Sequence, residues 1–149
     1  MEMAPTKYPT SALIDGQWID SSATFPVLNP ATGAEIAQVP NLGAKETKIA
    51  IDAASRALPA WSGKTAKERA IILKRWFDLV TADTEPLAQL MTAEQGKPLT
   101  EARGEVAYGA SFIEWFAEEG KRAYGRTIPT TVGSRRYITI KQPIGVIAA

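Results

Sequence analysis

The last nine residues, "KQPIGVIAA", constrain the fold of this chain more than any other stretch. Pro143 and Gly145 interrupt this stretch. Ile144, Val146 and Ile147 then make it apolar and β-branched, a pattern typical of strands that are buried on both faces. A buried strand needs neighbours, because its unpaired edges would leave backbone hydrogen bonds unmade. We therefore expect a strand that opens here and whose neighbours lie beyond the last residue.

Composition limits the classes of partner. The chain has 149 residues and a net charge of +1, with acidic and basic residues interspersed. This charge pattern lacks the concentrated basic field that nucleic acids or acidic membranes require, so we expect neither as a partner. No apolar stretch approaches the ~20 residues of a membrane span. The first ten residues lack the apolar core of a secretory signal, which predicts a cytoplasmic protein.

The chain contains no cysteine and no histidine. Disulfides, thiolate nucleophiles, Cys/His zinc sites and imidazole general bases are therefore excluded from these 149 residues. Any chemistry of this chain alone would use carboxylates, lysine, hydroxyl groups or tyrosine.

Two hairpins are predicted at the front of the chain. Asp15 and Gly16 form a dipeptide that accepts the positive φ angles of a tight hairpin turn, and extended segments flank it. The stretch "VLNPATGAEIAQVP" predicts a second hairpin with a wider turn from Asn29 to Gly33. A small antiparallel β layer should result.

About four helices follow. They are expected over residues 44–58, with Pro59 at the end; from Thr65, which has capping-box spacing to Glu68; from Thr84 to a stop at Gly96; and over residues 99–124. In the second helix an apolar stripe at helical spacing is predicted to face inward, formed by Leu73, Trp76, Phe77 and Val80. In the longest helix the inward line is Val106, Ala110, Ile113 and Ala117.

The pattern changes again after Gly125. The stretch "RRYITIKQ" alternates between polar and apolar residues as a half-exposed strand does. Up to Gln142 the residues are consistent with an α+β domain.

Several features are candidates for chemistry, and each has a plainer structural interpretation. The pairs Glu101/Glu105 and Glu114/Glu118 are suited to acid–base work or to a divalent ion, but are more typical of a solvated helix face. No G-x-G-x-x-G or phosphate-binding loop is present. Aromatic residues at helical spacing usually belong to a core; however, Trp115 and its neighbour Phe116 point in different directions, so one must face a partner or a cavity.

Several of these stretches resemble the N-terminal part of the aldehyde dehydrogenase superfamily. "LIDGQWID" is similar to its opening hairpin, "NPATGAEIAQVP" to the segment that follows, and "LMTAEQGKPLTEARGEV" to its most recognisable N-terminal block. "SFIEWFAEEGKRAYGRTIP" followed by "IKQPIGVIAA" is similar to the succinate-semialdehyde dehydrogenase branch.

The resemblance implies an α/β fold, the N-terminal part of a Rossmann-type subunit. Residues 1–125 would belong to the NAD(P)-binding domain. Residues 126–142 would supply a strand of the oligomerisation domain, pairing beyond its own domain. Residues 143–149 would start the first strand of the dinucleotide-binding sheet, and the catalytic domain would be absent.

In the family, a Cys thiolate attacks the aldehyde, donors hold the oxyanion, hydride passes to NAD(P)⁺, and water activated by a carboxylate hydrolyses the thioester. The residues for these steps lie beyond Ala149, so the resemblance places no catalytic, cofactor-binding or metal-binding residue in this chain. It does place four residues on the wall of the substrate tunnel: Gly104, Glu105, Tyr108 and Phe112.

The resemblance implies oxidation of succinate semialdehyde to succinate by a full-length homo-oligomer, a dimer or tetramer, and favours NADP over NAD. Other interpretations are a dehydrogenase for glutarate semialdehyde or an amino-aldehyde, or a non-catalytic oligomerisation or binding module. The 149-residue chain alone is expected to be inactive.

Overall fold

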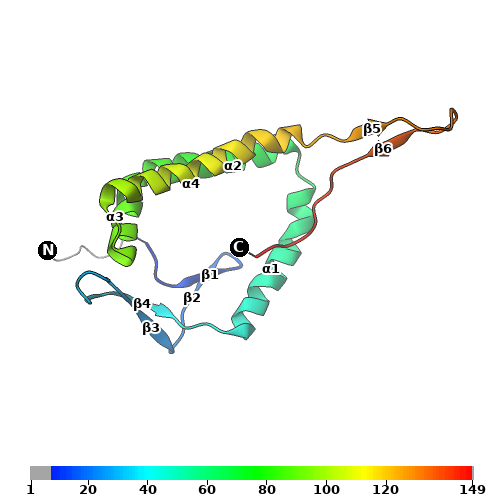
Figure 1. The fold of residues 1–149 in the computed structure, drawn as a ribbon. Helices are drawn as coiled ribbons and strands as arrows, with labels where there is room; N and C mark the ends of the chain where they lie inside the picture. Colours follow the sequence, from blue (N-terminus) through cyan, green and yellow to red (C-terminus); the bar gives the residue numbers. More distant parts are fainter. Residues whose placement is uncertain (1–7, 149) are drawn as a thin grey trace.

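The computed structural model describes residues 8–148 and consists of small antiparallel hairpins and four α-helices (Figure 1). In chain order the elements are β1 Ala12–Ile14, β2 Gln17–Ile19, β3 Thr24–Leu28, β4 Glu35–Pro40, α1 Ala44–Ser62, α2 Ala66–Ala82, α3 Thr84–Gln95, α4 Leu99–Glu119, the 3₁₀ turn η1 Gly120–Arg122, β5 Arg126–Ile128 and β6 Tyr137–Thr139.

Strands β1 and β2 form the first predicted hairpin, with Ala12 opposite Ile19. Asp15 has φ 54° and Gly16 has φ 75°. Both central residues thus adopt the positive φ that a two-residue turn of the I′ type requires. The sequence prediction is confirmed here.

Strands β3 and β4 form the second predicted hairpin, with a register shift between Val27 and Leu28. The Asn29 side chain organises its wide turn, because Oδ1 accepts hydrogen bonds from the backbone nitrogens of Ala31 at 2.9 Å and Thr32 at 3.3 Å. Gly33 completes the turn with φ 72°. This prediction is also confirmed.

Helix α1 is longer than predicted. It continues through Pro59 to Ser62, whereas the sequence suggested an end at Leu58. Proline accommodates a helical φ but lacks one backbone N–H donor. The helix can continue past it when the residues that follow donate hydrogen bonds to the carbonyls of the last turn. The Gly63 amide donates to the Pro59 carbonyl at 3.0 Å and supplies that bond.

The predicted capping box opens α2. The Thr65 amide donates to Glu68 at 2.7 Å, and the Glu68 amide donates back to Thr65 Oγ1 at 3.3 Å. Of the predicted inward stripe, Leu73, Phe77 and Val80 are half-buried. Trp76 is 55% exposed, so its assignment to the stripe is wrong. Helix α4 packs on α2 but leaves this edge of the stripe uncovered.

The core lies where α4 packs against α2 and α3 (Figure 1). Its centre is formed by Ala88, Ala102 and Val106. Small residues dominate, which lets the helix backbones approach closely. The predicted inward line of α4 is confirmed: Val106, Ala110 and Ala117 are buried and Ile113 is half-buried. Gly96 ends α3 with φ 76°, as predicted from its position after the helix.

The end of α4 differs from the prediction. The α-helix ends at Glu119, and residues 120–122 tighten into a 3₁₀ turn before the chain leaves the bundle, so helix does not reach Tyr124. The predicted strand is shorter, at Tyr137–Thr139, and it pairs antiparallel with β5. The expectation that this strand lacks a local partner is therefore wrong. The hairpin projects away from the helices (Figure 1).

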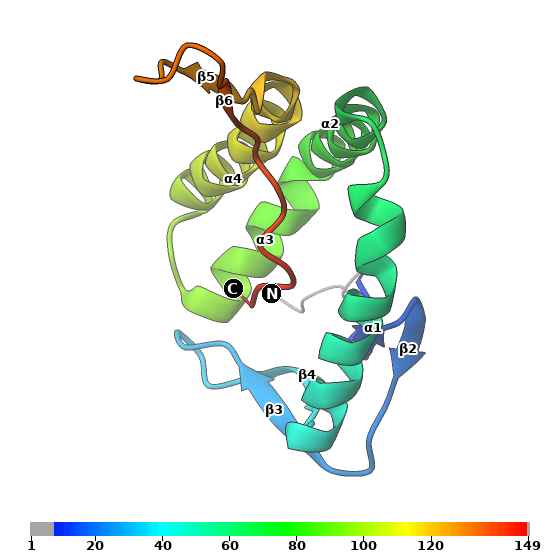
Figure 2. The ribbon, with the colours of Figure 1, turned by 90° about the vertical axis from the view of Figure 1, so that its right-hand side faces the viewer.

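The C-terminal segment returns from this hairpin toward the middle of the molecule (Figure 1 and Figure 2). Residues 143–148 belong to no strand, and Ala149 lies outside the described residues. Ile144 is 92% and Ile147 73% exposed. The predicted strand is therefore not formed: within residues 8–148 no strand pairs with this apolar segment, and most of its side chains are exposed.

Within residues 8–148, none of the helices combines the length and the apolar character needed to cross a bilayer.

Candidate functional site

The outer face of α4 carries a row of exposed aromatic side chains. Tyr108 is 65%, Phe112 47%, Trp115 62% and Phe116 58% exposed. They lie away from the buried line that contacts α2 and α3, with Phe116 flanking that line. The sequence predicted that one of Trp115 and Phe116 faces a partner or a cavity, and in the structure both are exposed. The general expectation that aromatic residues at helical spacing belong to a core does not hold on this face.

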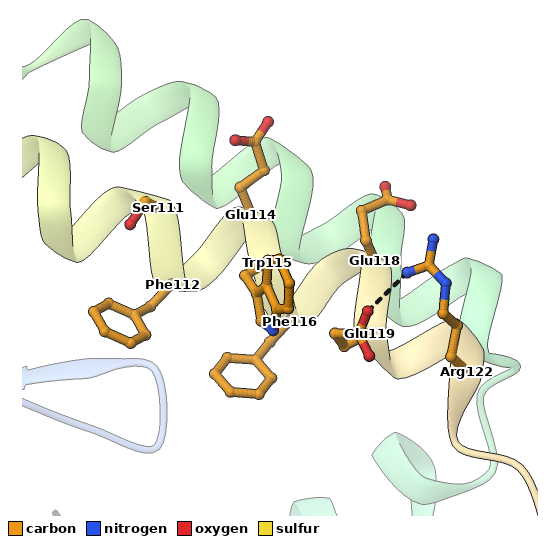
Figure 3. A pocket seen from close by; sticks show the side chains of 8 residues that line it. All are labelled: Ser111, Phe112, Glu114, Trp115, Phe116, Glu118, Glu119 and Arg122. Atoms are coloured by element: carbon orange, nitrogen blue, oxygen red, sulfur yellow. Dashed lines mark hydrogen bonds and ion pairs between the residues drawn. The ribbon is translucent and has the colours of Figure 1, made fainter.

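The C-terminal half of this face borders an open hollow of about 650 Å³ (Figure 3). Figure 3 shows Phe112 and Phe116 projecting from α4 toward the same side. Carboxylates and one arginine also line the hollow, with Glu114 and Glu118 projecting from α4 on the side away from the Phe112 and Phe116 rings (Figure 3). The lining residues are Ser111, Phe112, Glu114, Trp115, Phe116, Glu118, Glu119 and Arg122.

The four residues predicted for a tunnel wall lie on or beside this face. Glu105, Tyr108 and Phe112 follow each other at offsets of three and four, which places them on one side of the helix. The rings of Tyr108 and Phe112 meet edge to face, with centroids 4.8 Å apart and planes at 79°. A Cβ built on Gly104 would meet nothing within 4 Å, so open space adjoins the helix there. Of the four, Phe112 also lines the hollow.

Ion pairs occupy three of the four carboxylates that were candidates for acid–base work, and Glu101 forms none among residues 8–148. Glu105 pairs with Lys97, Glu114 pairs with Lys74 at 3.2 Å, and Glu118 pairs with Lys121 at 3.1 Å. Paired and exposed carboxylates of this kind are typical of a solvated helix face. The structural interpretation of these residues is thus the better one.

Lys74 links α2 to α4 through its pair with Glu114. Its ammonium also lies 4.0 Å from the ring centre of Phe77 and 3.5 Å from Asp78. Desolvation acts to lower the pKa of Lys74, but the hydrogen bond to Glu114 and the nearby carboxylate charges outweigh it and raise that pKa above its ordinary value.

Sequence reasoning missed the contact between Lys97 and Glu105. Lys97 follows Gly96 in the loop between α3 and α4, and its ammonium bonds the Glu105 carboxylate. The one available signal was its place eight residues before a glutamate on the next helix. This spacing alone does not predict a contact, because the distance between the two side chains depends on the turn at Gly96.

The described residues do not supply a site for a dinucleotide or a metal. The strands of residues 8–148 form three two-stranded antiparallel sheets, whereas a dinucleotide crevice needs adjacent parallel strands followed by helix N-termini. Within the same residues no three acidic, cysteine or histidine side chains gather as a metal site would require. NAD(P) therefore does not fit any group of residues described here.

The sequence over residues 18–149 matches the profile of the aldehyde dehydrogenase family. The chain belongs to this family. Its hairpins and its four helices match those of an N-terminal portion of an aldehyde dehydrogenase.

Curated relatives share more than half of the aligned residues. The chain is 60% identical over 140 residues to the succinate-semialdehyde dehydrogenase [NADP(+)] GabD of Escherichia coli, covering 93% of this chain. It is 59% identical over 140 residues, again 93% of this chain, to a glutarate-semialdehyde dehydrogenase of Pseudomonas aeruginosa. It is 54% identical over 147 residues, 97% of this chain, to a 3-sulfolactaldehyde dehydrogenase of Pseudomonas putida.

A solved structure has the same fold. The crystal structure of succinate-semialdehyde dehydrogenase from Burkholderia pseudomallei matches with a TM-score of 0.90 and 53% identity, covering 95% of this chain and 31% of that one. The chain spans 29–30% of the length of the three curated relatives.

Proposed function

We propose that this chain is the N-terminal part of an NAD(P)⁺-dependent aldehyde dehydrogenase that oxidises succinate semialdehyde to succinate. The observation that carries the proposal is the set of relatives. Their names specify dehydrogenases for succinate semialdehyde, glutarate semialdehyde and 3-sulfolactaldehyde. Each of these aldehydes bears a carboxylate or a sulfonate away from the reacting carbonyl. The substrate class is therefore an aldehyde with an anionic far end.

The reacting thiol of such an enzyme lies outside these 149 residues, because they contain no cysteine. This chain contributes part of the wall of the tunnel through which the aldehyde reaches the reacting thiol. The exposed face of α4 supplies part of the tunnel wall through Gly104, Glu105, Tyr108 and Phe112. Open space at Gly104 and the edge-to-face pair of Tyr108 and Phe112 support this role.

The domain division follows the same proposal. Residues 1–125 form the front of the NAD(P)-binding domain, residues 126–142 belong to an oligomerisation domain, and residues 143–149 open the first strand of the dinucleotide-binding sheet. The projecting β5–β6 hairpin supports the second assignment, since strands β5 and β6 are exposed over their whole length. We propose a homo-oligomer in the cytoplasm and NADP as the preferred cofactor, as the name of the Escherichia coli relative suggests.

The test is a substrate panel on the parent enzyme, obtained by extending the gene past Ala149. Reduction of NADP⁺ and of NAD⁺ is followed with succinate semialdehyde, glutarate semialdehyde, 3-sulfolactaldehyde, an amino-aldehyde and butanal. We expect the highest kcat/KM for succinate semialdehyde with NADP⁺. A higher kcat/KM for the amino-aldehyde or for butanal would contradict the proposed substrate class. A parent enzyme that oxidises none of them would favour a non-catalytic binding module.

A further inference from the structure

An ion pair joins the loop before α4 to the face proposed for the substrate tunnel. Lys97 Nζ bonds Glu105 Oε2, although the two residues are eight apart in sequence. The loop geometry makes this contact. Gly96 turns the chain with φ 76°, and Pro98 then begins the approach to α4 with φ −56°.

Lys97 is the less exposed partner of the pair. Its side chain is 24% exposed and that of Glu105 49% exposed. Among residues 8–148, no second cation forms an ion pair with Glu105.

Glu105 would be an obstacle to an anionic substrate if it stood alone. It shares a face with Tyr108 and Phe112, and Glu101 lies one turn before it on the same side. A carboxylate or sulfonate passing along this face would meet like charge, which raises the free energy of the bound substrate. A neutral aldehyde would not experience this repulsion. Lys97 reduces this repulsion because its ammonium neutralises the charge of the Glu105 carboxylate.

We propose that Lys97 is a specificity-determining positioning residue that neutralises Glu105 and so admits aldehydes with an anionic far end. This inference rests on the proposed function and assigns the charge balance of the tunnel wall to one ion pair. Lys97 acts through Glu105 and does not touch the reacting atoms.

The experiment compares two aldehydes of equal carbon number in the parent enzyme, succinate semialdehyde and butanal. Lys97→Met removes the charge and keeps most of the stem. It should raise KM for succinate semialdehyde about three- to tenfold and leave kcat and the KM for butanal unchanged. Lys97→Arg should restore the wild-type KM. At about 1 M salt, where the Debye length is about 3 Å, the effect of Lys97→Met should largely vanish.

Two further variants separate charge from packing. Lys97→Met combined with Glu105→Gln should return KM for succinate semialdehyde toward the wild-type value, because the unpaired carboxylate is then gone. Lys48→Met is the matched control, since it removes the same charge from an exposed pair with Asp52 on α1. It should change neither KM.

Equal effects of Lys97→Met on both aldehydes, or no recovery in the double variant, would overturn the inference while leaving the proposed function intact. Should Lys97→Met fail to fold, Glu105→Gln alone decides. With Lys97 retained it should lower KM for succinate semialdehyde, and an unchanged or higher KM would overturn the inference. A wild-type enzyme that oxidises neither aldehyde would overturn the proposed function and this inference together.

Discussion

Gly96 is the residue on which the connection between α3 and α4 depends. Its φ of 76° lies in the left-handed region, and a Cβ there would stand 3.0 Å from Pro30 Cγ in the β3–β4 turn. Both the backbone conformation and the tight contact favour glycine.

Gly96→Ala should therefore lower the free energy of unfolding by about 1–2 kcal/mol. Gly109→Ala is the matched control, because Gly109 lies inside α4 with nothing within 4 Å of a built Cβ. That change should stabilise the helix by up to ~1 kcal/mol. Thermal unfolding of the parent enzyme measures both. Equal effects of the two substitutions would contradict the role of the left-handed turn.

The ion pair of Glu85 with Arg103 should make the stability of the protein depend on pH. The Glu85 carboxylate accepts bonds from Arg103 Nε at 2.7 Å and from the Arg103 terminal nitrogen at 3.0 Å, which joins α3 to α4. Hydrogen bonds from Arg103 and Gln89 lower the pKa of Glu85 from 4.5 to about 2. A lowered pKa means that the stabilisation is complete above about pH 4.5 and is lost as the pH falls toward about 2.

Glu85→Gln should accordingly lower the unfolding temperature at about pH 6 and flatten its fall between about pH 4.5 and about pH 3. Glu94→Gln, on the same helix and outside this pair, should keep the wild-type pH dependence. The measurement is thermal unfolding of the parent enzyme across this range. An unaltered slope in Glu85→Gln would show that the ion pair does not contribute.

Single residues were predictable from sequence where local chemistry fixes the backbone. Asp15–Gly16, the Thr65–Glu68 box and Gly96 each took the predicted conformation because their signals depend on a few neighbouring residues. Lys97 was not predictable. Its contact with Glu105 depends on how two helices are joined, and no local pattern encodes that.

At the scale of elements, helix periodicity predicted the buried lines well and the helix ends less well. Val106, Ala110 and Ala117 are buried because their spacing matches one face of α4. Pro59 suggested the end of α1, yet a proline near a C-terminus costs one bond and need not stop the helix. Strand β5 was missed because Arg126–Ile128 is too short for a pattern.

Pro59→Ala tests this account of α1. The substitution restores a backbone donor in the last turns of the helix and removes the ring, so it should stabilise the protein by up to ~3 kcal/mol. A higher unfolding temperature and an increased helical circular dichroism signal are expected. A loss of stability would show that the proline makes a favourable contact that outweighs the missing bond.

At the scale of the whole molecule, the chain leaves many large apolar side chains exposed. Trp115 on α4, Trp76 on α2 and Ile144 in the C-terminal segment are each more than half exposed. The centre of the core is built from alanine and valine, and no large side chain of residues 8–148 is fully buried. An apolar surface of this extent is typical of a partner interface.

The sequence predicted that the final apolar segment lacks neighbours of its own, and the structure leaves Ile144 and Ile147 exposed. The sequence could not show which faces of the helices remain uncovered, since burial depends on tertiary packing. Trp76 illustrates the limit: its spacing fits an inward stripe, but the neighbouring helix does not reach it.

NADP⁺ reduction with succinate semialdehyde tests the proposed function when it is measured in parallel for the purified 149-residue chain and for the parent enzyme. We propose that this chain shapes the approach of the substrate while the reacting thiol belongs to the rest of the polypeptide. We predict turnover by the parent enzyme and none by the 149-residue chain. Turnover by the 149-residue chain alone would contradict the account.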